Sequence, residues 1–238
     1  MLFSLAGCKG CSQSGLRHQA QQQEVSQEDN NFNRTAESSE SVNVQEPADR
    51  ELDSSDRSLN TLFKKYRSAV FMVYTSDNEK TYQGSGFFIN SNGLALSNYH
   101  VFKGTQKGSE VIETESGEYK ISKVIEHNEE KDYIIFQVGN LSGNNYLEIS
   151  NVMPEIGEEV WAISNPRGLS HTLTTGIVSG YRDDQYIQMT TEITHGSSGG
   201  ALMDMNGKVV GITTMGVGEA NLNFAVKINE IQLGRFID

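Results

Sequence analysis

Cysteine is nearly absent from this chain of 238 residues, which contains only Cys8 and Cys11. Both lie at the start of the chain, so no disulfide bond can stabilise a domain formed by the rest of it. The spacing Cys8-Lys9-Gly10-Cys11 also occurs in zinc and redox sites, but no second pair of cysteines completes a metal site. The sequence therefore predicts neither a metal nor a cofactor.

Basic residues are also few, since 19 lysines and arginines stand against 31 aspartates and glutamates, and the formal net charge is −12. Proteins that bind nucleic acids present basic patches that displace counterions from phosphates. A nucleic-acid partner is therefore excluded. The sequence also lacks a run of about 18–20 apolar residues, the length that a transmembrane helix needs.

The first 57 residues have too few apolar side chains to form a core. Residues 19–27 consist almost entirely of Gln, Glu, Ala and Ser, and residues 30–56 are rich in Ser, Asn, Glu and Asp. Burial of so little apolar surface cannot offset the entropy that is lost when a chain is ordered. We predict a disordered acidic tail over residues 1–57 and one folded domain over residues 58–238.

The pattern of residues 58–238 is that of an all-β domain with a short helix at each end. The apolar residues of 59–66 have the i, i+3, i+4, i+7 spacing of a helix, which Asp56 or Ser58 can cap. The apolar residues of 228–236 predict a short C-terminal helix. Between the helices we predict short strands, with Asn-Gly turns among their connections, at residues 71–74, 86–89, 94–97, 119–125, 133–138, 160–164, 173–180, 186–191, 201–203, 208–213 and 222–226.

The segment Ile-Thr-His-Gly-Ser-Ser-Gly-Gly-Ala-Leu places Ser198 in a glycine-rich turn between strands. Ser198 is therefore a candidate nucleophile, and the amides of Gly196, Ser197 and Ser198 are candidates for an oxyanion hole. We expect Gly196 to permit the turn. We expect Gly199 and Gly200 to let the backbone of a substrate come close.

A serine hydroxyl is a weak nucleophile without a base, and the sequence offers one. His100 follows a predicted strand, and Asp132 precedes another. The order His, Asp, Ser is one of the known orders of the Ser-His-Asp triad, the one found on paired β-barrels. Each of the three residues has an ordinary structural explanation by itself. The prediction of a triad of His100, Asp132 and Ser198 therefore depends on their occurring together.

Four segments, in order along residues 58–238, match one known pattern: Gly-Ser-Gly-Phe-Phe-Ile (84–89) with Asn-Tyr-His-Val (98–101), Asp-Tyr-Ile-Ile (132–135), Ala-Ile-Ser-Asn-Pro-Arg-Gly-Leu (162–169) with Thr-Gly-Ile-Val-Ser (175–179), and residues 196–202 with 206–212. In these segments the chain resembles trypsin-like serine proteases of the HtrA/Deg branch, which are bacterial envelope proteases. The resemblance implies a chymotrypsin-like fold of two six-stranded antiparallel β-barrels with the active site between them. It also implies a periplasmic location.

The resemblance also concerns regulation and assembly. HtrA relatives usually carry PDZ domains after the protease domain, and we expect none in this chain. Many relatives form trimers, so a homotrimer is an expectation from the resemblance alone. Ser197 stands where digestive relatives carry an aspartate that pairs with a newly cut N-terminus, so we do not expect activation by such a cut.

The start of the chain leaves two interpretations open. Leu5-Ala6-Gly7-Cys8 resembles the lipobox of bacterial lipoproteins, whose cysteine is lipidated. Only seven residues, without Lys or Arg, precede Cys8, whereas a signal peptide has a basic region and about 7–15 apolar residues. Either the true signal begins upstream of Met1 and Cys8 anchors the protein to a membrane of the envelope, or the match arises by chance.

Two alternatives concern the side chain preferred before the scissile bond. The HtrA pattern places Ile193 in one wall of the specificity pocket, with Met215, Gly216 and Phe224 opposite, and such a pocket fits small or medium aliphatic side chains. Glu192 instead occupies the position where trypsin carries the acid that selects Lys or Arg. We favour Ile193 because an unpaired buried carboxylate is costly.

The sequence thus predicts a serine endopeptidase that cleaves exported or unfolded proteins. His100 would accept the proton of Ser198, and Asp132 would orient the imidazole. The alternative is an inactive protein of the same fold that holds polypeptides as a chaperone does. The intact set of three polar residues favours hydrolysis.

Overall fold

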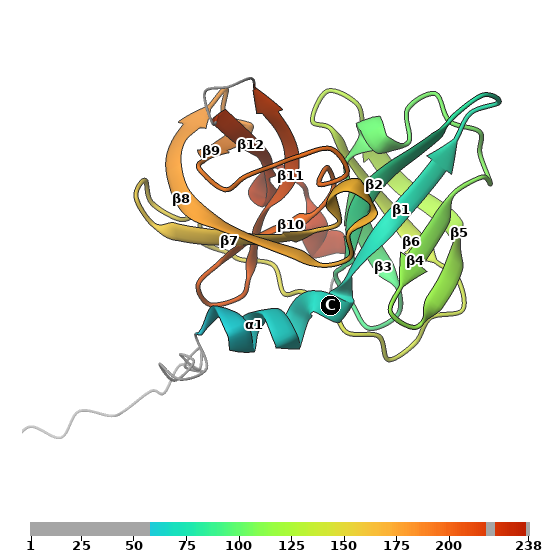
Figure 1. Cartoon of the computed structure of the whole chain (residues 1–238), viewed down its shortest axis with the longest axis horizontal. Helices are drawn as coiled ribbons and strands as arrows, with labels where there is room; N and C mark the ends of the chain where they lie inside the picture. The colour runs from blue at the N-terminus through green and yellow to red at the C-terminus, as the bar shows by residue number, and fades with distance from the viewer. Residues whose placement is uncertain (1–57, 218–221, 237–238) are drawn as a thin grey trace, which may run out of the picture. The chain divides into compact units, whose positions relative to one another are not determined.

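The computed structural model describes residues 58–217 and 222–236, so the predictions for residues 1–57, including lipidation of Cys8, lie outside it. The elements of the described residues follow one another (Figure 1) as α1 (Leu59–Tyr66), η1 (Arg67–Ala69), β1 (Val70–Ser76), β2 (Thr81–Phe88), β3 (Leu94–Ser97), η2 (Tyr99–Val101), β4 (Val111–Thr114), β5 (Gly117–Asn128), β6 (Tyr133–Val138), β7 (Glu159–Ser164), η3 (Pro166–Gly168), β8 (Thr172–Arg182), β9 (Tyr186–Met189), β10 (Ala201–Asp204), β11 (Val209–Val217), β12 (Leu222–Lys227), η5 (Ile228–Glu230) and η6 (Leu233–Arg235).

The strands of the described residues form two closed antiparallel barrels of six strands each, in the order β1-β2-β3-β6-β5-β4 and β10-β11-β12-β9-β8-β7. This confirms the predicted fold class. Strand β4 is the one that the sequence analysis does not predict. Its four residues, Val-Ile-Glu-Thr, are too few to show a clear alternation, and its pairing with β1 joins segments that are distant in the sequence.

Helix α1 forms where the sequence predicts it. Its cap is Ser58, whose Oγ accepts a hydrogen bond of 3.2 Å from the Thr61 amide. Leu62 and Tyr66 are buried. A Cβ at Gly207, in the turn between β10 and β11, would lie 2.4 Å from the Tyr66 ring. The absence of a side chain at Gly207 therefore lets α1 pack closely on the second barrel.

The C-terminal segment is not the single helix that the sequence predicts. It forms two separate 3₁₀ turns, η5 and η6, and Ile231 between them is extended (φ −106°, ψ 120°). Ile228, Ile231 and Leu233 are all buried in one cluster. Their spacing of three and then two residues matches no face of one α-helix, so burial is achieved by breaking the helix.

Each barrel has its own core, and a third cluster of buried residues includes members from both barrels. In the first barrel the ring of Phe71 lies 4.5 Å from that of Phe88 and 6.3 Å from that of Phe136. The shared cluster contains Trp161, which is fully buried and donates its Nε1–H to the Asp204 carbonyl (2.8 Å). Burial of the shared cluster holds the barrels in one arrangement.

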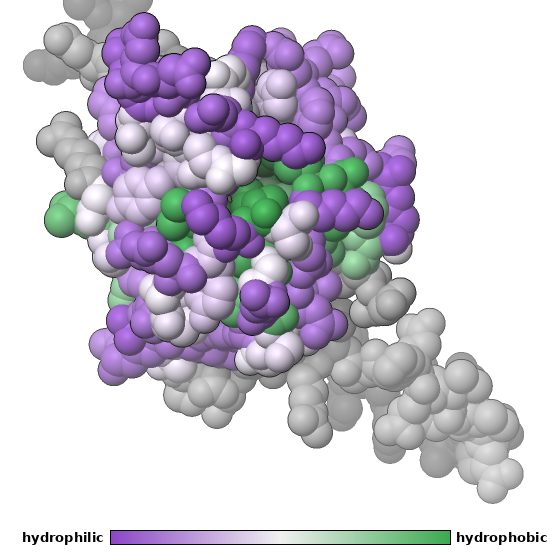
Figure 2. Space-filling view, turned by 90° about the vertical axis from the view of Figure 1, so that its right-hand side faces the viewer, coloured by the Kyte–Doolittle hydropathy of each residue, from purple (hydrophilic) through white to green (hydrophobic). Residues whose placement is uncertain are grey.

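The outer face of the first barrel is mostly hydrophilic. Figure 2 shows the side that lies to the right in Figure 1, where hydrophilic side chains surround a smaller hydrophobic area. Strand β5 lies on this side, and its residues are exposed or half-buried, whereas nearly all of β6 is buried. Among the described residues, no helix has the length and apolar character that crossing a lipid bilayer requires.

Glycines of the turn before β10 lie where the two barrels meet. Gly199 has a φ of 89°, and a Cβ there would lie 2.0 Å from the Ser85 carbonyl oxygen of β2. A Cβ at Gly200 would lie 2.7 Å from the Ile163 carbonyl oxygen and 2.7 Å from Ser164 Cβ, both of β7. The expectation that these glycines admit a substrate backbone is therefore wrong. They admit strands of the protein itself.

Substitution of Gly199 should be far more damaging than substitution of another glycine with the same backbone conformation. Gly108 also has a φ of 89°, but no atom lies within 4 Å of a Cβ built there. We expect Gly108→Ala to lower the free energy of unfolding by about 1–2 kcal/mol, the cost of a left-handed alanine. Gly199→Ala should lose more than about 4 kcal/mol because the methyl group overlaps β2. Urea unfolding followed by fluorescence measures both, and equal losses would contradict the steric explanation.

Tyr133 at the start of β6 should make the fold sensitive to alkali. Its burial, together with its hydrogen bond to Glu126 Oε1 (2.7 Å), raises the pKa of its hydroxyl from 10.0 to about 12. An unfolded tyrosine ionises near pH 10, so ionisation favours the unfolded chain between the two pKa values. We expect the free energy of unfolding to fall by about 1 kcal/mol more in the wild type than in Tyr133→Phe between pH 10 and pH 11. Parallel urea titrations at the two pH values test this, and identical losses would show that Tyr133 does not contribute.

Candidate active site

His100 and Asp132 form a hydrogen-bonded pair. His100 lies in η2, directly after β3, and its Nδ1 lies 2.8 Å from Asp132 Oδ2 and 3.1 Å from Oδ1. The main-chain amide of His100 donates to the same carboxylate (2.9 Å). An ionised carboxylate only accepts hydrogen bonds, so Nδ1 of a neutral His100 carries the proton and Nε2 is left free to accept one. The pair therefore has the chemistry of a general base.

The carboxylate of Asp132 is held by several donors. Thr214 Oγ1 donates to Oδ2 (2.8 Å), in addition to the two nitrogens of His100. Asn98, which is fully buried, donates its Nδ2–H to the Asp132 carbonyl oxygen (2.9 Å). Asp132 itself has a φ of 50°, in the left-handed region that few non-glycine residues adopt. These contacts compensate the backbone strain and fix the carboxylate beside the imidazole.

Ser198 lies on the turn between β9 and β10 and belongs to the same group of contacts. Its Oγ donates to the Thr214 carbonyl oxygen (2.8 Å). Among the described residues, no hydrogen bond joins Ser198 to His100. Thr214 thus contacts Asp132 through its hydroxyl and Ser198 through its carbonyl. Because a serine hydroxyl has one hydrogen, that hydrogen must leave the Thr214 carbonyl before it can be donated to the imidazole.

The amides of the turn divide into two kinds. The Ser197 amide donates to the Thr194 carbonyl oxygen (2.9 Å) and is engaged within the turn. Within the part of the chain that the structure describes, neither the Gly196 amide nor the Ser198 amide donates a hydrogen bond to the protein. Gly196 has a φ of 90°, a conformation that glycine adopts at little cost. Of the three predicted donors, Gly196 and Ser198 therefore keep free N–H groups, and Ser197 does not.

His100, Gly196 and Ser198 border a cleft of about 490 Å³. Its walls come from both barrels and comprise Tyr82, Gln83, His100, Val101, Ile193, Thr194, His195, Gly196, Ser198, Thr214, Met215 and Gly216.

The predicted specificity residues are only partly brought together. Ile193, Met215 and Gly216 line the cleft. Phe224 does not, since it lies in β12 with its ring edge-on to a tyrosine of β9. Glu192 is exposed and also lies outside the cleft lining.

Thr214, Tyr82 and Gln83 were not predicted as site residues from the sequence. Tyr82 and Gln83 directly precede the Gly-Ser-Gly of the first motif, and this adjacency is the only signal that the sequence carries for them. Thr214 resembles any threonine of a buried strand. Its role is visible only once β11 is placed beside Asp132.

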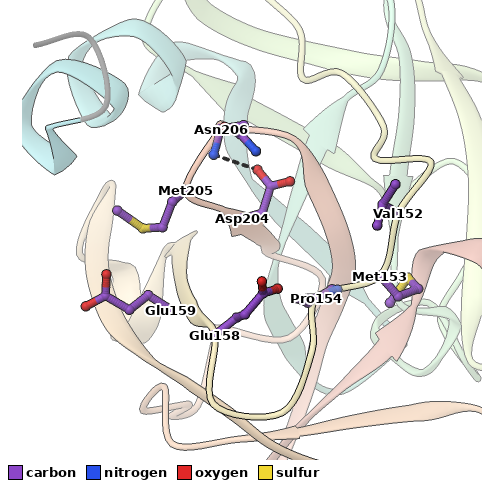
Figure 3. A pocket seen from close by; sticks show the side chains of 8 residues that line it. All are labelled: Val152, Met153, Pro154, Glu158, Glu159, Asp204, Met205 and Asn206. Atoms are coloured by element: carbon purple, nitrogen blue, oxygen red, sulfur yellow. Dashed lines mark hydrogen bonds between the residues drawn. The ribbon is translucent and has the colours of Figure 1, made fainter. Parts of the chain in front are cut away.

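A second hollow, of about 430 Å³, lies on the second barrel beside the turn between β10 and β11. Figure 3 shows its lining side chains, which are Val152, Met153, Pro154, Glu158, Glu159, Asp204, Met205 and Asn206. Asp204 Oδ1 accepts a hydrogen bond from the Asn206 main-chain amide (2.8 Å) and so stabilises the turn (Figure 3). None of the described residues that line this hollow is a serine, histidine or cysteine, so the cleft at Ser198 remains the candidate for nucleophilic chemistry.

Comparison with known proteins identifies the family to which the chain belongs. Residues 84–212 match the model of the trypsin-like peptidase domain. The chain is 34% identical over 160 residues to the periplasmic pH-dependent serine endoprotease DegQ of Escherichia coli (strain K12), which covers 61% of this chain and 35% of the relative. It is 31% identical over 182 residues to the serine protease HTRA1A of Danio rerio, with coverage of 68% and 36%. The chain thus spans about a third of the length of these relatives.

A solved structure shows the same fold. The serine endoprotease from Yersinia pestis superposes with a TM-score of 0.65 and 26% sequence identity, over 76% of this chain and 65% of the other. The matched family region contains η2, β6 and the turn of Ser198, and hence every residue of the candidate triad. From its fold, its matched motifs and these relatives, the chain belongs to the trypsin-like peptidase family and is a homologue of the HtrA/Deg serine proteases.

Proposed function

We propose that this protein is a serine endopeptidase in which Ser198, His100 and Asp132 form the catalytic triad. The observation that carries the proposal is the bidentate contact of His100 Nδ1 with the Asp132 carboxylate, beside a serine on a turn with two free amides. The triad chemistry needs these groups in this arrangement. The names of the HtrA and Deg relatives, which are serine proteases and endoproteases, support the same activity.

The reaction would begin when Ser198 leaves the Thr214 carbonyl and turns toward His100. Nε2 of His100 removes the hydroxyl proton as Oγ attacks the carbonyl carbon of the scissile peptide bond. The negative charge that forms on the carbonyl oxygen is stabilised by the amides of Gly196 and Ser198. Asp132 stabilises the resulting imidazolium through Nδ1–H.

The tetrahedral intermediate then collapses to an acyl-enzyme. The imidazolium gives its proton to the nitrogen of the leaving amine, and the carbon–nitrogen bond breaks. A water molecule, deprotonated by the same imidazole, attacks the ester and releases the acid, and Ser198 recovers its proton. No metal or cofactor takes part in these steps.

Location and substrates follow from the relatives. The DegQ relative and a do/HhoA-like relative from Haemophilus influenzae are described as periplasmic, which supports action in the periplasm on exported or unfolded proteins. An anchor at Cys8 and a homotrimer are supported by the sequence resemblance alone.

The substrate pocket would select a small or medium aliphatic side chain before the scissile bond. Ile193 lines the cleft, and Met215 and Gly216 lie in the same lining. Glu192, which would select a basic side chain, is exposed instead of facing the cleft. The position of Ile193 favours the aliphatic preference.

One observation favours the alternative function of polypeptide binding without catalysis. Ser198 Oγ donates to Thr214 and not to His100, so the described state is not poised for attack. A fluorophosphonate probe distinguishes the two functions because it forms a covalent bond only with an activated serine.

Loss of the nucleophile should abolish cleavage without loss of the fold. Ser198→Ala and His100→Ala should each lower kcat on an unfolded casein-like protein by about 10⁴–10⁶. Both variants should unfold at the same urea concentration as the wild type, and Ser198→Ala should not be labelled by the fluorophosphonate. If Ser198→Ala kept more than about a hundredth of the activity, another residue would be the nucleophile.

Mapping of cleavage sites should separate Ile193 from Glu192. On a mixture of denatured proteins we expect Val, Ala or Leu before the cut. Ile193→Ala should change this preference, and the exposed Glu192→Gln should leave it unaltered. Cuts after Lys or Arg that disappear in Glu192→Gln would instead assign the pocket to Glu192.

A further inference from the structure

Three consecutive carbonyl groups of the nucleophile turn are held by residues outside the turn. The Gly196 carbonyl accepts from Ser85 Oγ (2.8 Å). The Ser197 carbonyl accepts from Thr213 Oγ1 (2.7 Å) and also from the Gly200 main-chain amide (3.0 Å). The Ser198 carbonyl accepts from the Ser85 main-chain amide (2.7 Å). Ser85 belongs to β2 of the first barrel and Thr213 to β11 of the second. The turn is thus held by hydrogen bonds from both barrels.

Peptide geometry turns these contacts into an orientation of the amides. The described residues contain no cis peptide bond, and in a trans peptide the carbonyl and the following N–H point in opposite directions. The bond from Thr213 to the Ser197 carbonyl therefore directs the Ser198 N–H away from β11. The bond from Ser85 to the Gly196 carbonyl likewise fixes the peptide between Gly196 and Ser197. The N–H of this peptide belongs to Ser197 and donates to the Thr194 carbonyl on the opposite side.

Gly196 is the residue of the turn with the greatest rotational freedom. Its φ of 90° sets the direction of its own amide relative to the peptide that follows. When Ser85 holds that following peptide, the Gly196 amide is restrained as well. Without the Ser85 hydroxyl the Gly196 carbonyl could rotate into the cleft, where it would repel a developing oxyanion.

The direction of the Ser85 hydrogen bond is determined by its partners. The Asn165 main-chain amide, which can only donate, gives its hydrogen to Ser85 Oγ (2.9 Å). The hydroxyl hydrogen of Ser85 is then available for the Gly196 carbonyl. Ser85 and Thr213 are both completely buried, so no water can replace either hydroxyl. Among the described residues, the Gly196 carbonyl has no donor other than Ser85, and without Thr213 the Ser197 carbonyl keeps only the Gly200 amide.

We propose that Ser85 and Thr213 are positioning residues, whose hydroxyls hold the carbonyls of Gly196 and Ser197 so that the Gly196 and Ser198 amides face the cleft. This proposal rests on the endopeptidase function proposed above. Neither hydroxyl contacts the substrate, and both act through the backbone of the turn.

The test compares variants that remove or keep each hydroxyl. Thr213→Val keeps the shape of the side chain without its hydroxyl, Thr213→Ser keeps the hydroxyl, and Ser85→Ala removes the other one. We expect Thr213→Val and Ser85→Ala each to lower kcat about tenfold with KM within about twofold, a fraction of the 10²–10³ lost with a whole oxyanion donor. Thr213→Ser should retain kcat within about threefold.

Two controls match the chemical change elsewhere in the fold. Ser109→Ala removes a half-buried hydroxyl that donates to the Ser76 carbonyl (3.1 Å), and Ser150→Ala removes one that donates to the Val152 carbonyl (2.7 Å). Both should keep kcat within about twofold. The final extent of fluorophosphonate labelling measures the fraction of protein with a folded active site. Thr213→Val and Ser85→Ala should therefore reach the same final extent as the wild type, but at a lower rate.

The outcomes separate this proposal from the proposed function. If the wild type cleaves and is labelled, and Thr213→Val and Ser85→Ala keep wild-type kcat, the positioning role is overturned and the function stands. If the controls lose as much kcat as the two test variants, the effect is structural and the role is also overturned. If the wild type neither cleaves nor is labelled, both proposals fail. Should Thr213→Val not fold, Ser85→Ala against Ser150→Ala decides.

Discussion

The contact between the nucleophile turn and strand β2 is the constraint on which the site depends. Gly199 approaches so closely that a Cβ would lie 2.0 Å from the Ser85 carbonyl oxygen, and the Ser85 amide in turn donates to the Ser198 carbonyl. The turn belongs to the second barrel, whereas β2 and His100 belong to the first. The position of Ser198 relative to His100 is therefore set by the packing of one barrel on the other. The shared cluster around Trp161 stabilises that packing.

Hydrogen bonds between the two barrels also orient the side chains of the site. Thr214 of β11 reaches Asp132 through its hydroxyl and receives the Ser198 hydroxyl on its carbonyl. Asp132 adopts a left-handed backbone, which is stabilised because Asn98 and Thr214 bind its carbonyl and carboxylate. Because Asn98 and Thr214 are buried, these hydrogen bonds constrain the geometry more than exposed ones would. The proposed triad is thus organised around Thr214 as much as around its own members.

Some elements could be predicted from the sequence with good boundaries, and the reasons are local. Helix α1 has an apolar stripe and a serine cap, while β3 and β6 are short apolar runs, and all three have the predicted limits. Strand β4 was missed because four residues give too little pattern. The prediction of a C-terminal helix was wrong because burial of Ile228, Ile231 and Leu233 in the cluster shared by the two barrels outweighs helical continuity. Where tertiary packing decides the conformation, a periodic pattern is a weak guide.

The sequence by itself determined the residue types of the site, because a nucleophile, a base and an acid in this order within glycine-rich flanks match few other chemistries. It also determined the all-β fold class. Only the tertiary structure decided that Gly199 and Gly200 accommodate strands and not substrate, that the Ser197 amide is engaged, and that Phe224 lies outside the cleft. These facts depend on contacts between segments far apart in the chain, such as Ser85 with Gly196 and Thr214 with Asp132. A sequence pattern records which side chains are present, whereas hydrogen bonds between distant backbones arise only when both barrels have closed and packed.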